Sequence, residues 1–161
     1  MSPTEKRERA RPTRPAMYTV ADIMTRELVT LKESDDVGLA DRVFGLRRIR
    51  HLPVVDGGRL VGLITHRDLL RCYASRGESQ GKACHAREMM TTQVTTVLPE
   101  TPLRKALKLM LKNKFGCLPV VASNGKLVGL ITEADLVHFA AEVISELDKF
   151  QKSMASLTGE E

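Results

Sequence analysis

The chain contains nearly the same twelve residues twice. "RLVGLITHRDLL" runs from Arg59 to Leu70, and "KLVGLITEADLV" runs from Lys126 to Val137. "HLPVV" and "CLPVV" begin 66 positions apart, whereas the two "LVGLIT" segments begin 67 apart, because "ASNGK" has one residue more than "DGGR". Turns tolerate such insertions. A duplicated segment constrains the fold strongly, since both copies must form the same structural unit. The two copies extend over residues 17–76 and 85–143.

Each copy has the same order of patterns. A short β-prone segment ("ELVTL" or "QVTTV") precedes an amphipathic helical pattern, for which Ser34 or Asp35 is the expected first cap. "LPVV", a glycine turn and "LVGLIT" then predict two strands, and a second helix is expected to begin near Asp68 or Asp135. Each copy therefore predicts β-α-β-β-α, in the α/β (α+β) class. Since one copy is too small to bury both faces of its sheet, we expect the two to pack together.

The order of these motifs resembles that of the CBS (cystathionine β-synthase) domain family over residues 17–143. Two such repeats in tandem form a Bateman module. The resemblance implies packing with pseudo-two-fold symmetry and a regulatory role rather than an enzymatic one. The implied ligand is an adenine nucleotide (AMP, ADP or ATP), with S-adenosylmethionine or another adenosyl compound as the alternative. The bound state would be passed to a partner protein that the sequence does not identify.

A threonine and an aspartate three residues apart occupy each strand-to-helix junction, as Thr65 with Asp68 and as Thr132 with Asp135. The simplest interpretation is a capping box, which needs no ligand. A helix N-terminus also attracts phosphate, and a carboxylate there accepts hydrogen bonds from ribose hydroxyls. The family resemblance implies that these four residues contact the ribose-phosphate part of an adenine nucleotide, and both interpretations can hold at once.

The adenine base needs an apolar slot, for which only the resemblance supplies candidates. The alternative for all of them is an ordinary core position. They lie on the first strands and just before the central strands of the two copies: Val29, Thr95, His51, Pro53, Cys117 and Pro119.

Charge differs between the copies. Arg50, His66 and Arg67 are candidates for binding phosphate in the first copy, because arginine binds phosphate bidentately. Glu133 occupies the position that matches His66, so the second site is expected to take a less charged ligand or to stay empty. For Arg47, Arg48 and Arg50 together, a solvated helix end is a nearly equal alternative.

The outer segments suggest other roles. Residues 1–16 carry five Lys/Arg and three prolines and read as a disordered basic tail, 77–84 as a linker, and 144–161 as a helical extension and tail. The extension continues an apolar stripe that predicts a homodimer. A nucleic-acid binder using the basic tail is a weaker alternative, because aromatic residues are only 4% of the chain.

Other classes of function find little support. No nucleophile–base pair or metal-ligand cluster is evident, so we expect no enzyme, no metal and no required cofactor. The three cysteines include no C-x-x-C pair and suggest reduced thiols in a cytoplasmic protein. No apolar run approaches the length of a membrane span, so no membrane association is expected.

Overall fold

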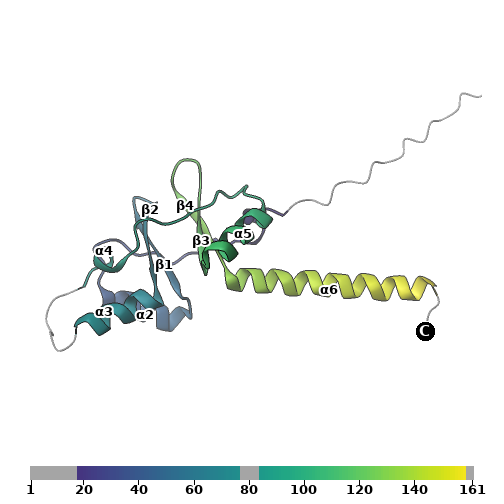
Figure 1. Cartoon of the computed structure of the whole chain (residues 1–161), viewed down its shortest axis with the longest axis horizontal. Coiled ribbons are helices and arrows are strands. Elements are labelled where there is room, and N and C mark those ends of the chain that lie inside the picture. The colour runs from purple at the N-terminus through teal and green to yellow at the C-terminus, as the bar shows by residue number, and fades with distance from the viewer. Residues whose placement is uncertain (1–17, 77–83, 159–161) are drawn as a thin grey trace, which may run out of the picture.

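The computed structural model describes residues 18–76 and 84–158. The predicted basic tail, 1–16, and most of the predicted linker, 77–84, lie outside these residues. The first repeat consists of α1 (Val20–Ile23), α2 (Val37–Arg47), β1 (His51–Asp56), β2 (Arg59–Thr65) and α3 (His66–Arg76). The second consists of α4 (Ala86–Met89), α5 (Leu103–Asn113), β3 (Cys117–Val121), β4 (Leu127–Thr132) and α6 (Glu133–Thr158). Figure 1 shows the two antiparallel hairpins, β1–β2 and β3–β4, side by side at the centre of the molecule.

The predicted order of elements is confirmed with two differences. "ELVTL" and "QVTTV" do not form strands of their own, because each contributes only one parallel bridge, Leu31 to Val54 or Val97 to Val120. The N-cap of α2 is Asp36, one residue beyond the predicted positions, and its carboxylate accepts a hydrogen bond from the backbone N–H of Leu39 at 2.8 Å.

The repeats exchange their first segments. Val20 and Met24, from the start of the first repeat, are buried in the core of the second, beside Leu118 and Ile131. In the matching way, Ala86 from the second repeat is buried in the core of the first. Backbone bridges also join the first segment of each repeat to a strand of the other, because Thr25 pairs with Leu130 and Thr91 pairs with Leu63. The fold therefore has the predicted pseudo-two-fold symmetry, and each repeat needs the other to complete its core.

The glycine of each "LVGLIT" strand makes this exchange possible. A Cβ atom on Gly129 would lie 2.6 Å from the sulfur of Met24 and 3.1 Å from the backbone oxygen of Thr25. The methionine of the second repeat, Met90, crowds Gly62 in the same way. Each exchanged methionine thus packs directly onto the backbone of the other repeat's strand.

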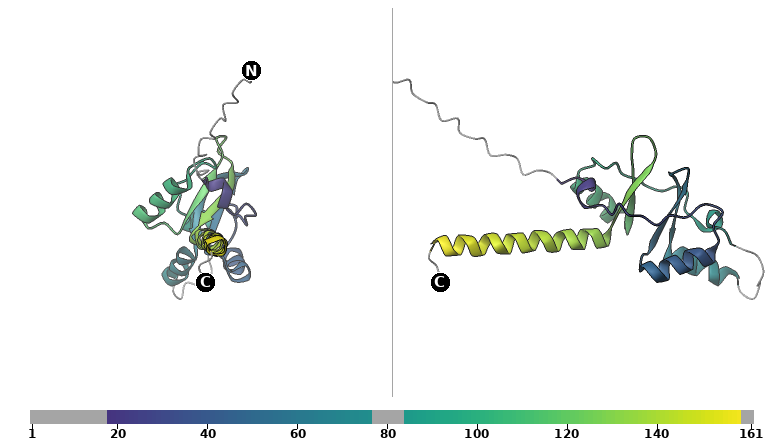
Figure 2. Two further views of the ribbon diagram at one scale, coloured as in Figure 1. Left: turned by 90° about the vertical axis from the view of Figure 1, so that its right-hand side faces the viewer. Right: turned by 180° about the vertical axis from the view of Figure 1, so that it is seen from behind.

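Helix α6 projects beyond the rest of the molecule (Figure 1). Leu136 and Phe139, in its first turns, pack against the core of the second repeat, and the remainder extends away from both hairpins (Figures 1 and 2). Large apolar side chains on this free part are exposed, among them Leu147 at 55% and Phe150 at 64%. No helix in the described part of the chain combines the length and apolarity needed to cross a membrane.

Candidate functional site

Both predicted threonine–aspartate pairs form capping boxes. The backbone N–H and the hydroxyl of Thr132 donate to one oxygen of Asp135, both at 2.7 Å. Thr65 donates to Asp68 in the same way, at 2.8 and 2.6 Å. A third pair, Thr19 with Asp22, repeats this geometry at the start of α1, and neither of its members lines any of the four pockets described. A capping box alone therefore does not mark a ligand site. We call the three helix starts with such a pair corners, and only their surroundings can show which of them binds a ligand.

The Asp135 corner opens into a cavity of ≈ 540 Å³, which we call the Asp135 pocket. Its volume lies within the range of ordinary ligand sites. Both repeats contribute to its walls. It is lined by Thr25, Glu27, Leu28, Val29, Arg47, Arg48, Ile49, Arg50, His51, Gly116, Leu130, Thr132, Glu133, Ala134, Asp135 and His138.

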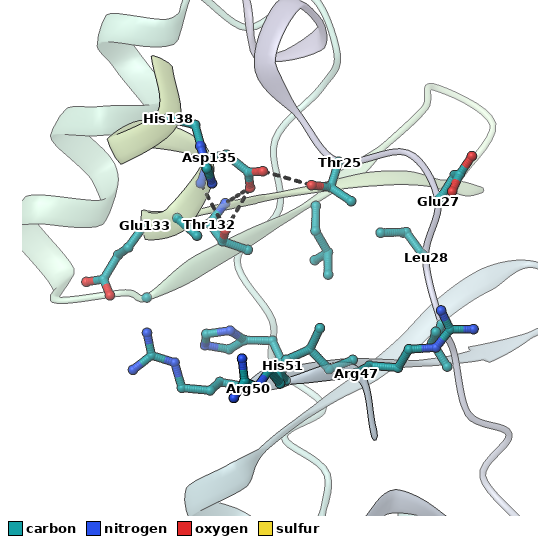
Figure 3. Close-up of a pocket in the computed structure, with 16 residues that line it drawn as sticks. Thr25, Glu27, Leu28, Arg47, Arg50, His51, Thr132, Glu133, Asp135 and His138 are labelled. Carbon is teal, nitrogen blue, oxygen red and sulfur yellow. Dashed lines mark hydrogen bonds between the residues drawn. The ribbon is translucent and has the colours of Figure 1, made fainter. Parts of the chain in front are cut away.

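The polar groups of the Asp135 pocket face each other across it. Figure 3 shows Thr25, Thr132 and Asp135 on one side, and Arg47 and Arg50 on the other. The second oxygen of Asp135 accepts a hydrogen bond from the Thr25 hydroxyl at 2.8 Å, so the exchanged first segment also orients the carboxylate. An ionised carboxylate offers about four lone-pair positions, and three of those on Asp135 are already occupied, so one position remains, on the oxygen that faces Thr25.

A neighbouring cavity of ≈ 580 Å³, the Thr65 pocket, contains the other threonine. It shares Arg50, His51, Gly116 and Glu133 with the Asp135 pocket, so these four residues form a common wall. The rest of its lining is Leu63, Thr65, His66, Arg67, Leu70, Lys114, Phe115 and Cys117.

The two pockets differ in formal charge, counting histidines as neutral. The arginines of the Asp135 pocket are balanced by three carboxylates, those of Glu27, Glu133 and Asp135. In the Thr65 pocket, Arg50, Arg67 and Lys114 oppose only the Glu133 carboxylate, which leaves two positive charges in excess. The Thr65 pocket is therefore the more favourable place for an anion.

Each pocket is lined by one basic residue whose backbone is strained. Arg48 and Lys114 are the C-caps of α2 and α5, with left-handed φ values of 53° and 56°. Glycine is the usual residue at such helix ends, because other side chains are strained there. Residues in sparsely populated backbone regions cluster at functional sites. Their placement agrees with a site built to attract negative charge.

Two ionisable side chains of the Thr65 pocket, His51 in the common wall and its neighbour Cys117, have pKa values shifted toward the neutral form. Burial lowers the pKa of His51, as does the nearby Arg50 cation, while Glu133 and Asp68 oppose the shift. Burial, assisted by the Glu133 carboxylate, raises the pKa of the Cys117 thiol to about 12. Cys117 therefore stays protonated at neutral pH, which makes it a poor nucleophile.

The structure brings together many, but not all, of the predicted site residues. Val29, Thr132 and Asp135 line the Asp135 pocket, and Arg50 and His51 line both pockets. The residues found in the Thr65 pocket alone are Thr65, His66, Arg67 and Cys117.

Four predicted residues lie elsewhere. Pro53 and Pro119 are fully buried core residues. Thr95 is exposed and lines none of the four pockets described. Asp68 lines a separate small pocket, and its second oxygen lies 3.8 Å from a guanidinium nitrogen of Arg71.

Sequence reasoning also missed how the pockets are assembled. Arg47 and Arg48 were expected beside the first threonine corner or in solvent, yet both line the pocket of the second corner, with Asp135. Thr25 was not predicted to be a site residue, although its "M-T" motif recurs at Thr91. His138 was not predicted to be a binding residue, although it lies three residues after Asp135, on the same face of α6. Among residues 18–76 and 84–158, no group of three or more metal-binding side chains comes together.

Comparison with known proteins identifies the family. The model of the CBS domain matches residues 20–75 and again 86–142, so the chain belongs to the CBS domain family as a tandem pair. Its fold is that of the AcuB protein of Vibrio cholerae, provisionally named for acetoin utilization (TM-score 0.74, 36% identity, covering 83% of this chain and 97% of that one).

Two solved relatives of similar size contain adenosyl compounds. The protein CBSX2, known from Arabidopsis thaliana, was solved with AMP (TM-score 0.68, 33% identity, covering 78% of this chain and 98% of that one). The CBS domain pair of protein MJ0100 was solved with 5′-methylthioadenosine and S-adenosyl-L-methionine (TM-score 0.69, 28% identity, covering 78% and 98%).

Several curated relatives are longer enzymes. They include homoserine O-acetyltransferase of Methanohalobium evestigatum (32% identical over 124 residues) and inosine-5′-monophosphate dehydrogenase of Korarchaeum cryptofilum (33% over 123). Each match covers 76% of this chain but only 24% of the enzyme, so the chain spans about a quarter of these relatives. The shared part is a CBS pair, a regulatory module.

Proposed function

We propose that the protein is a regulatory module that binds an adenine nucleotide between its repeats and transmits the bound state to a partner protein in the cytoplasm. The observation that carries this proposal is the Asp135 pocket, which has a volume of ≈ 540 Å³. In it, the carboxylate that Thr25 orients faces arginine side chains on the opposite wall. The same corner geometry at Asp22 faces none of the pockets described, which separates capping from binding.

The pocket offers a place for each part of a nucleotide. Asp135 accepts a hydrogen bond from a ribose hydroxyl at its remaining position, because a carboxylate is an acceptor only. Leu28, Val29 and Ile49 supply an apolar surface for the adenine ring. The phosphates then point toward Arg50 on the common wall, and those of ADP or ATP extend into the more cationic Thr65 pocket.

This arrangement predicts that affinity rises from adenosine to AMP to ATP. Arg67→Ala, in the Thr65 pocket, is expected to weaken ATP about tenfold while changing adenosine binding little, since an ionic hydrogen bond contributes about 1.5–3 kcal/mol. Isothermal titration with each ligand measures the effect, and Arg71→Ala, outside both pockets, is the control. Equal affinities for adenosine and ATP would contradict the placement of the phosphates.

S-adenosylmethionine is the second candidate ligand. Its sulfonium cation suits the carboxylates of Glu27 and Glu133 in the charge-balanced Asp135 pocket. The MJ0100 structure contains this compound in a related fold. A thermal-shift screen of both compound classes decides between them, because a ligand that binds only the native state raises the melting temperature. Mass spectrometry of the copurifying small molecule gives an independent answer.

We also propose that the protein is a homodimer joined through α6. Six residues on this helix repeat at alternating spacings of three and four, as in a coiled coil. The later members are exposed, so a second copy of the helix would cover them. The six are Ala140, Val143, Leu147, Phe150, Met154 and Leu157.

These six residues form the seam of the proposed dimer. Leu147→Glu is expected to convert the dimer to a monomer, because each chain would bury one carboxylate without a partner in this seam. Light scattering should give twice the 17.9 kDa chain mass for the wild type and 17.9 kDa for the variant. Ser145→Glu adds the same charge outside the seam and should remain dimeric. A monomeric wild type, or a dimeric Leu147→Glu, would refute this interface.

A further inference from the structure

Two cysteines from opposite sides of the repeat boundary meet in the structure. Cys72 lies in α3, and Cys84 comes shortly before α4, at the start of the second repeat. Their sulfur atoms are 2.8 Å apart. A disulfide has an S–S distance of about 2.05 Å, so the two atoms need to approach by only roughly 0.8 Å. The function proposed above does not use this pair.

Both cysteines line a pocket next to the repeat boundary. The side chains are mostly buried, with 9% of Cys72 and 4% of Cys84 exposed. They nevertheless line an open pocket of ≈ 400 Å³, together with Asp68, Arg71, Ser75, Glu88 and Met89. This pocket is the route by which a low-molecular-weight disulfide would approach the pair.

The backbone around Cys84 is held in place by the first repeat. The carbonyl of Cys84 accepts a hydrogen bond from the N–H of Val37, the first residue of α2, at 2.7 Å. The N–H of Ala86 donates to the carbonyl of Asp35, also at 2.7 Å. Because these bonds fix one cysteine and α3 carries the other, the two sulfur atoms are held close together.

We propose that Cys72 and Cys84 form a reversible disulfide that fastens α3 to the start of the second repeat. The oxidant is a low-molecular-weight disulfide such as oxidised glutathione. One cysteine thiolate attacks it, forming a mixed disulfide and releasing one small thiol. The other cysteine, after losing its proton, displaces the second small thiol. The protein gives up two electrons and two protons, and the oxidant becomes two thiols.

The bond has a consequence for the neighbouring threonine–aspartate corner. Asp68 lies one helical turn before Cys72 and lines the same pocket. Fastening Cys72 therefore restrains the turn of α3 that carries Asp68. Cys117 takes no part, because it lies in the Thr65 pocket with its thiol held neutral by burial.

The test is oxidation of the full-length wild-type chain by oxidised glutathione, followed by mass spectrometry under non-reducing conditions. We expect a loss of two mass units and a tryptic product that joins residues 72–76 to residues 83–87, both reversed by dithiothreitol. Cys117→Ala should behave as the wild type, whereas Cys72→Ala and Cys84→Ala should give neither product. The oxidised wild type should melt about 5–10 °C above its reduced form.

Three outcomes would overturn the proposal. They are a chain that keeps all three thiols, a chain that carries only glutathione adducts, and cross-links that involve Cys117 or join two chains. The decisive product is sought in the wild type and in Cys117→Ala, so the test does not depend on the folding of the Cys72 and Cys84 variants.

Discussion

Asp135→Ala is expected to weaken AMP binding by about 30-fold or more. The carboxylate offers one charged acceptor position to a ribose hydroxyl, and a hydrogen bond to a charged group contributes about 1.5–3 kcal/mol. The variant also loses the Asp135 half of the capping box at the start of α6, which costs roughly 1 kcal/mol of stability. Isothermal titration with AMP, performed well below the melting temperature of the variant, measures the loss of affinity separately from the loss of stability.

The chain supplies two matched controls for this experiment. Asp22→Ala removes the same type of cap from α1, at a corner that faces none of the described pockets, so its AMP affinity should be unchanged. Asp68→Ala removes the pseudo-symmetric carboxylate, whose second oxygen lies near Arg71, and should cost less affinity than Asp135→Ala. An unchanged AMP affinity in Asp135→Ala would refute the proposal that Asp135 binds the ribose. Equal losses of AMP affinity in Asp135→Ala and Asp68→Ala would refute the proposed difference between the two corners.

Gly129→Ala is expected to destabilise the fold by about 1–3 kcal/mol, an overpacking penalty. The added methyl group would lie 2.6 Å from the Met24 sulfur and 3.1 Å from the Thr25 carbonyl oxygen, so the exchanged segment must move. Thermal unfolding should show a melting temperature lower by roughly 3–10 °C. Nucleotide affinity should fall as well, because Thr25 orients Asp135.

The control for this substitution is a glycine-to-alanine change that is expected to increase stability. Gly45 lies in α2 with nothing within 4 Å of an added Cβ, so Gly45→Ala should stabilise the fold by about 0.5–1 kcal/mol. Adding Met24→Ala to Gly129→Ala should cost less than the sum of the two single changes, since the clash disappears. Strictly additive costs would show that the methionine and the glycine do not contact each other as described.

Much of the fold could be predicted because the duplication supplies its own check. α2 and α5 begin 66 residues apart, as do β1 and β3, which is the spacing of the repeated motifs. The helical and strand periods of apolar residues were strong enough to place these elements. The first strands were not, because Leu31 and Val97 each form only one bridge, and five β-prone residues do not reveal how many will find partners.

The site was only partly predictable, for a physical reason. Local patterns indicate that Thr132 and Asp135 share a helix start, but not that Thr25 from the other repeat will complete the corner. Arg48 looks like an ordinary solvated helix end until the packing of the two repeats places it in the lining of the pocket that contains Asp135. The proximity of Cys72 and Cys84 was equally hidden, since eleven residues separate them and no spacing rule brings them together.

The exchanged first segments determine the smallest unit that can fold. A fragment ending at residue 76 would carry the first hairpin without Ala86, and it would expose the Val20 and Met24 side chains that belong in the other core. Neither half is therefore an autonomous folding unit. Heating should melt both repeats in a single cooperative transition, and a nucleotide bound at one corner should protect amide hydrogens throughout the pair.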